Sequence, residues 1–148
     1  MHERMTYLAS ECDLTPLLRT LLRLRHDFVM IGRTAAAPLP AGFQVRLGPP
    51  LARISDASAD YLRASGVALV GRQQAPSHGA VDGAFDDYAA EMTRLRHQDL
   101  TRDLPVEAMD RIFTLAFALE QLRRDFNDLE RCVAGHSEPR GSRRLAAV

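Results

Sequence analysis

The last long segment of the chain carries an uninterrupted heptad pattern of apolar residues. The apolar positions recur at alternating spacings of three and four: Ile112, Leu115, Leu119, Leu122, Phe126, Leu129 and Val133. In an α-helix this spacing places all these side chains on one stripe, which packs against other helices. The pattern therefore predicts a long helix that has Pro105 in its first turn, runs to about Ala134 and stops at Gly135.

Three earlier segments repeat the spacing, and each gives a further predicted helix. The first has Thr15 as N-cap, Pro16 at the first helical position and an end before Pro38. The second starts at Pro49 and Pro50, and Ser77 caps the third. The predicted seams are Leu17, Leu21, Leu24, Phe28, Ile31 and Ala35; Leu51, Ile54, Ser58, Tyr61, Ser65 and Ala68; and Val81, Phe85, Tyr88, Met92 and Leu95. Small residues in the second seam allow close helix approach or leave that seam weak.

The predicted fold class is all-α, an antiparallel four-helix bundle over residues 1–135 followed by a disordered, mildly basic C-terminal tail over residues 136–148. The charges of the predicted helices agree with this arrangement. Residues 16–36 carry four arginines and one aspartate, whereas residues 78–99 and 103–134 each carry three more acidic than basic side chains. Helix faces of opposite charge help to select which helices pair.

Length and composition narrow the class of protein. A chain of 148 residues suits a single domain, and 19 basic against 19 acidic residues leave no basic field for nucleic acid. The only cysteines, Cys12 and Cys132, are expected to be free thiols. The longest nearly apolar run, Ile112 to Leu119, is far below the ~18 residues of a membrane span, so the chain is predicted to be soluble as written.

No reactive constellation is evident in the sequence. None of the five histidines follows a glutamate at the spacing of a di-iron site, and no nucleophile elbow, Gly-rich phosphate loop or CxxC motif occurs. We therefore expect no enzyme activity, no cofactor and no catalytic or metal-binding residues. Arg19 and Arg23, four residues apart, are a possible anion contact, and salt bridges to acidic neighbouring helices are the alternative.

Two stretches of the chain resemble one known family. The string LLRTLLRLRHDFVMIGR (Leu17–Arg33) and the run LTRDLPVEAMDRIFTLAFALEQLRRDFNDLERCV (Leu100–Val133) are similar to segments of the FUSC family. These fusaric acid resistance and aromatic acid exporter-like proteins of Gram-negative bacteria join transmembrane bundles to cytoplasmic helical regions. The resemblance implies a cytoplasmic helical domain at the inner membrane, with a structural or assembly role in an efflux transporter. It transfers no site residues, and a chain without a membrane segment cannot transport anything alone.

Two further expectations concern partners. The resemblance implies the transmembrane part of the same or a neighbouring protein as the partner. The alternative function is a stand-alone regulatory bundle that binds a small anion. Phe113, Ala116 and Phe117 widen the apolar stripe of the last helix and are either packed inside the bundle or exposed. If they are exposed, weak homo-oligomerisation follows.

Overall fold

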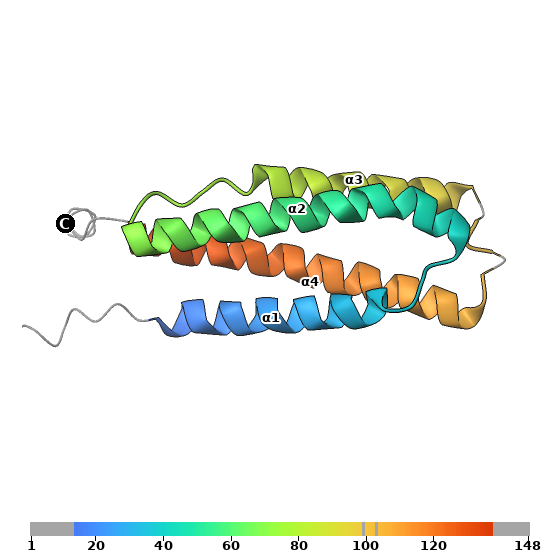
Figure 1. The fold of residues 1–148 in the computed structure, drawn as a ribbon, viewed down its shortest axis with the longest axis horizontal. Helices are drawn as coiled ribbons and strands as arrows, with labels where there is room; N and C mark the ends of the chain where they lie inside the picture. The colour runs from blue at the N-terminus through green and yellow to red at the C-terminus, as the bar shows by residue number, and fades with distance from the viewer. Residues whose placement is uncertain (1–13, 99, 103, 138–148) are drawn as a thin grey trace, which may run out of the picture.

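Four antiparallel helices, joined by short connectors, form the protein (Figure 1). A computed structural model of the chain describes residues 14–98, 100–102 and 104–137. The helices are α1 (Thr15–Ala35), α2 (Ala41–Gly71), α3 (Gly79–His97) and α4 (Val106–Ser137), and no strand occurs in the described ranges. The prediction of an all-α helical bundle is therefore confirmed. Cys12 and most of the expected tail, residues 138–148, lie outside the described residues.

The helices pack as two pairs, α1 on α4 and α2 on α3, and α4 also contacts α2 and α3. No Cα atom of α1 lies within 8 Å of a Cα atom of α2. Figure 1 shows the corresponding space between α1 and α2, with α4 behind it. One side of the four-helix arrangement is therefore open, although α1 and α2 are consecutive in sequence.

The seams predicted for α3 and α4 are correct at every position. All of their members are buried, and those of α4 include the fully buried Phe126 and Val133. Pro105 accepts hydrogen bonds from the Ala108 and Met109 amides with its carbonyl group, and so opens α4 in the expected place. Regular apolar spacing was sufficient here because each of these helices is covered by neighbours on one broad side.

The seam predicted for α1 is only partly correct. Leu17 and Leu24 are buried, but the other buried residues are Thr20 and Asp27, whereas the predicted Leu21 and Phe28 are 41% and 40% exposed. The buried stripe of α1 therefore consists of Leu17, Thr20, Leu24 and Asp27, and it lies beside the predicted stripe on the helix surface. This stripe faces α4, because Thr20 contacts Cys132 and the Arg23 guanidinium reaches two aspartates of α4.

The predicted start of α2 is wrong. The helix begins at Ala41, where the Pro40 carbonyl accepts hydrogen bonds from the Phe43 and Gln44 amides. Pro49 and Pro50 therefore lie inside the helix rather than at its start. Each proline lacks an amide donor, which weakens the helix locally, and the amino-terminal part of α2 bends (Figure 1). Burial of Phe43 and Leu47 favours continuation of the helix through this weak point.

The predicted end of α4 is also wrong, because Gly135 does not terminate the helix. It has no positive φ, and α4 continues to Ser137. The His136 ring nitrogen Nδ1 lies 3.0 Å from the Cys132 carbonyl, and the Ser137 hydroxyl donates to the Val133 carbonyl at 3.0 Å. These side-chain contacts accompany the last turn, so the helical domain extends two residues past the predicted boundary at 135.

Helix α2 ends in an unusual backbone conformation. Gly71 is its last residue, but the left-handed position that usually holds glycine is occupied by Arg72, with φ 50° and ψ 39°. The Gln73 amide then donates to the Ala68 carbonyl at 2.9 Å, which closes the end of the helix. The predicted connector before α3 is confirmed. Ser77, the predicted cap of α3, lies one residue before the N-cap residue His78, and its hydroxyl oxygen accepts a hydrogen bond from the Gly79 amide.

Ion pairs join α3 to both α4 and α2, although the predicted net charges of α3 and α4 have the same sign. Arg123 of α4 pairs with Asp82 and Asp86 of α3 at 3.1 and 2.8 Å. Arg46 of α2 pairs with Glu91 of α3, and the pKa of Glu91 is lowered by its hydrogen bonds to Arg94 and then to Arg46. None of the helices in the described ranges is both long and apolar enough to cross a membrane.

Candidate functional site

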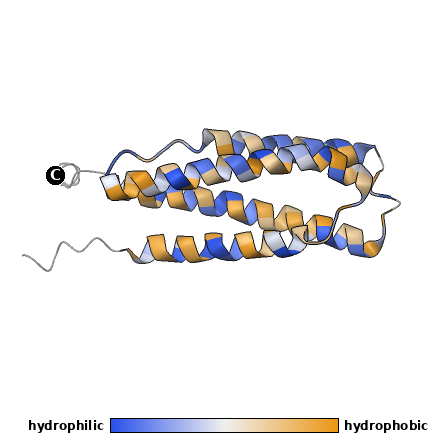
Figure 2. Ribbon diagram, in the orientation of Figure 1, coloured by the Kyte–Doolittle hydropathy of each residue, from blue (hydrophilic) through white to orange (hydrophobic). Residues whose placement is uncertain are grey.

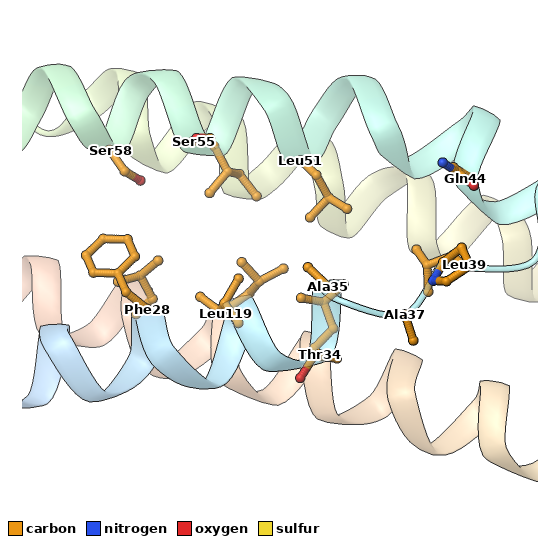
Figure 3. Close-up of a pocket in the computed structure, with 15 residues that line it drawn as sticks. Phe28, Thr34, Ala35, Ala37, Leu39, Gln44, Leu51, Ser55, Ser58 and Leu119 are labelled. Atoms are coloured by element: carbon orange, nitrogen blue, oxygen red, sulfur yellow. The ribbon is translucent and has the colours of Figure 1, made fainter.

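A cavity of about 300 Å³ lies at the closed end of the space between α1 and α2. The connector between these helices, through Ala37, Pro38 and Leu39, covers one end of the cavity (Figure 3). Leucines of α4, including Leu119, form its floor, and Phe28 and Ser58 face each other at its far end (Figure 3). No charged side chain lines it. The cavity can therefore accept an apolar group but offers no counter-ion to an anion.

Ser58 is the buried polar group of this cavity. The residue is 2% exposed, and its Oγ has no hydrogen-bond partner in the described structure. The side chain points from α2 toward Phe28 (Figure 3). The Thr34 hydroxyl, by contrast, donates to the Met30 carbonyl at 2.9 Å. Ser55 and Gln44 are exposed, so Ser58 is the lining group whose hydrogen bonding is left incomplete in the interior.

An aromatic cluster lies next to the cavity. The Tyr61 and Phe126 rings meet edge to face with centroids 5.5 Å apart, and Tyr61 is in the same relation to His78 at 6.1 Å. Burial raises the pKa of Tyr61, so its hydroxyl is neutral at ordinary pH. The His78 ring nitrogens lie 2.9 Å from carboxylate oxygens of Asp82 and Glu130. These contacts tie α2 and α3 to α4, and they make Tyr61 and Phe126 part of the hydrophobic core.

Asp27 and Asp125 form a pair of carboxyl groups between α1 and α4. Burial, then the hydrogen bond to Asp125 and the charge of Asp125, raise the pKa of Asp27 to about 6. The Arg23 guanidinium lies 2.8 Å from Asp125 and 2.6 Å from Asp128. Arg23 and His26 favour the ionised form of Asp27 but do not outweigh burial. The pair therefore holds a proton well above the pH at which a free aspartate loses it.

The structure places Arg19 and Arg23, the possible anion contact, in different surroundings. Arg23 makes salt bridges to α4, which was the alternative interpretation of these arginines. Arg19 is exposed and has no ion pair with any described residue. The two guanidinium groups are therefore in different electrostatic surroundings, because among the described residues only that of Arg23 is paired with carboxylates.

The described residues contain no group of histidine, cysteine and carboxylate side chains that could hold a metal ion. Cys132, a free thiol, is half-buried and lies 4.0 Å from the Thr20 hydroxyl. No sequence pattern predicted the cavity directly. Its one signal was Ser58, a small polar residue at a seam position of α2, where a larger apolar side chain would have filled the space.

Apolar side chains are also exposed along the open side of the bundle. Leu21, Arg25 and Val29 of α1 form one wall of a shallow groove, and Leu62 of α2 lies on the other. We call this surface the α1–α2 groove. It adjoins the cavity through Phe28, and hydrophobic residues recur along both of its helices (Figure 2).

Two other parts of the surface are apolar. Leu18 and Leu22, on the outer face of α1, are 57% and 64% exposed. Phe113 and Phe117 of α4 are exposed, so of the two possibilities left open by the sequence the structure shows exposure.

Comparison with models of protein families, with curated proteins and with solved structures gave no match to the chain.

Proposed function

We propose that this chain is a helical accessory domain with a structural or assembly role, and that its partner is an apolar helix of a FUSC-type membrane protein. The observation that carries the proposal is the open side of the bundle, where no Cα atom of α1 lies within 8 Å of one of α2 and apolar side chains line the space between the two helices. A groove of this shape is the kind that a partner helix fills in helix-in-groove recognition.

The exposed surface of α1 supports a position next to a membrane. Besides its outward leucines, it carries Arg19, Arg25 and Arg33, which are exposed and have no ion pair with any described residue. A helix with leucines and unpaired arginines on its outer side suits the boundary between apolar chains and anionic headgroups. Arginine is also typical of cytoplasmic segments near membrane spans. The proposed location is the cytoplasmic side of the bacterial inner membrane.

We propose the identity of the partner from the resemblance of Leu17–Arg33 and Leu100–Val133 to FUSC segments. Both stretches fall largely on α1 and α4, the pair that forms one half of the bundle. The domain would hold or orient the transmembrane helices of an organic acid exporter, either in the same protein or encoded beside it. No chemical step is assigned to it.

Co-expression with a FUSC-type membrane protein tests the proposal. The chain should remain with washed membranes only when that protein is present. The double variant Leu21→Glu with Val29→Glu places two charges on the α1 wall of the α1–α2 groove and should release the chain. Its matched control, Phe113→Glu with Phe117→Glu, changes two exposed apolar residues of α4 and should leave the chain bound. Equal retention of both variants, or no retention of the unchanged chain, would show that the proposal is wrong.

A further inference from the structure

We infer that the cavity between α1, α2 and α4 is a binding site for a small, uncharged and mostly apolar molecule that carries one hydroxyl group. The inference does not rest on the proposed assembly role, because the cavity is enclosed by α4 and by the connector between α1 and α2 rather than by a partner. It also differs from the anion-binding alternative, since no charged residue lines this space.

The volume and the lining define the body of the ligand. About 300 Å³ is at the small end of ligand pockets, and the walls are mostly leucine, isoleucine, alanine and proline side chains. Phe28 closes the far end, and its half-exposed ring can pack on a ring of the ligand. A charged group would be desolvated here without compensation, so the ligand must be neutral at the buried end.

Ser58 defines the polar part of the ligand. A buried hydroxyl oxygen without a partner is unfavourable, and a bound molecule that donates or accepts a hydrogen bond removes this cost. The side chain already points into the cavity, toward Phe28 (Figure 3). A hydroxyl group suits Ser58 because each hydroxyl can donate and accept. An apolar body with a single hydroxyl at the Ser58 end therefore matches the apolar walls and gives the Ser58 hydroxyl a partner.

Ligand-observed and protein-observed NMR titrations on the purified chain provide the test, with 4-propylphenol, propylbenzene and 4-propylbenzoate as probes. The phenol should bind saturably and shift resonances of residues that line the cavity. Propylbenzene should bind about three- to tenfold more weakly, because it cannot bond to Ser58. The benzoate should bind at least about tenfold more weakly than the phenol, because its charge is desolvated in the cavity.

Three variants assign the effect to the site. Ser58→Ala should weaken the phenol about three- to tenfold and leave propylbenzene unchanged. Ser65→Ala is the matched control, since Ser65 is the other buried serine of α2 and does not line the cavity, and it should change neither affinity. Ser55→Phe places a ring at the exposed mouth and should abolish binding of both probes.

The inference is overturned if the unchanged chain does not bind the phenol saturably, if Ser58→Ala binds it as tightly, or if the benzoate binds equally well. The result is separable from the proposed function. Leu21 and Val29 do not line the cavity, so the groove variant Leu21→Glu with Val29→Glu should bind the phenol normally even though it is expected to lose the membrane partner.

Discussion

The rings of Phe28 and Phe126 meet edge to face across the contact between α1 and α4, with centroids 6.5 Å apart and planes inclined by 68°. Although they touch, their surroundings differ, because Phe28 is 40% exposed and Phe126 is fully buried. The heptad pattern placed both residues on buried seams. The structure shows that Phe28 instead lies at the edge of the cavity and contributes one side of its ring to the core.

Truncation of these two residues should therefore have unequal effects on stability. Phe126→Ala should lower the free energy of unfolding by about 3–5 kcal/mol, because it leaves a cavity in the core. Phe28→Ala should cost about 1–2 kcal/mol, since only part of its side chain is removed from water. Urea denaturation measures both. Phe117→Ala is the matched control on exposed α4 surface, where the change should stay within about 0.5 kcal/mol. Equal losses at positions 28 and 126 would contradict the exposure of Phe28.

The left-handed conformation of Arg72 gives a stabilising substitution. Arg72→Gly should raise the free energy of unfolding by about 1 kcal/mol, because glycine adopts positive φ without the steric cost of a side chain. Thermal and urea denaturation would measure the gain. The same change at Arg63, exposed within α2, should instead cost about 1 kcal/mol, since glycine is a poor helix former. A loss of stability in Arg72→Gly would argue against the left-handed end of α2.

Asp27 should make stability depend on pH between about 4 and 7. Its pKa is raised from 3.8 in the unfolded chain to about 6 in the folded protein, so the folded state holds the proton more tightly. The contribution of Asp27 to stability is thus fully present below about pH 4 and is lost as pH rises through 6. The loss should amount to about 2–3 kcal/mol.

Asp27→Asn isolates this effect, since asparagine can donate to Asp125 at every pH. The variant should gain stability relative to the unchanged chain as pH rises from 4 to 8. Glu91, whose lowered pKa acts in the opposite sense at more acidic pH, is common to both proteins and cancels in the comparison. Stability curves that run parallel across this range would show that Asp27 titrates normally in the folded state.

Exposure of Phe113 and Phe117 leads us to predict weak self-association. Sedimentation velocity should show a larger average mass at higher protein concentration, with little effect of salt because the surface is apolar. Phe113→Ser with Phe117→Ser should reduce the effect. Dissociation by moderate salt would point to the charged helix faces instead, because salt screens exposed charges. A monomer at all concentrations would remove the basis for this prediction.

The purified chain is expected to contain no stoichiometric metal. The sequence has no paired ligand spacing, and the described residues contain no suitable cluster. Elemental analysis after gentle purification measures this directly. One zinc or iron ion per chain would show that ligands outside the described residues, or from a second copy, complete a site.

Apolar spacing in the sequence was sufficient to predict the class of fold, the four helices and the buried stripes of α3 and α4, including Leu95 and Phe126. Apolar spacing is a local property, and a helix covered by neighbours on one side must bury the stripe that this spacing creates. The sequence was less informative about helix ends. Pro49 and Gly135 are usual start and stop signals, but tertiary burial and local side-chain bonds carried α2 and α4 past them.

The buried stripe of α1 and the position of the open space depend on how the helices pack against one another. Leu17 and Leu24 belong to two overlapping stripes, one completed by Leu21 and Phe28 and the other by Thr20 and Asp27. The packing of α1 on α4 selects the second stripe, because Arg23 then lies close enough to pair with Asp125. The separation of α1 from α2, and with it the cavity at Ser58, depends on how helices distant in sequence pair. Such pairing is a property of the whole assembly of helices, which the period of any one segment does not contain.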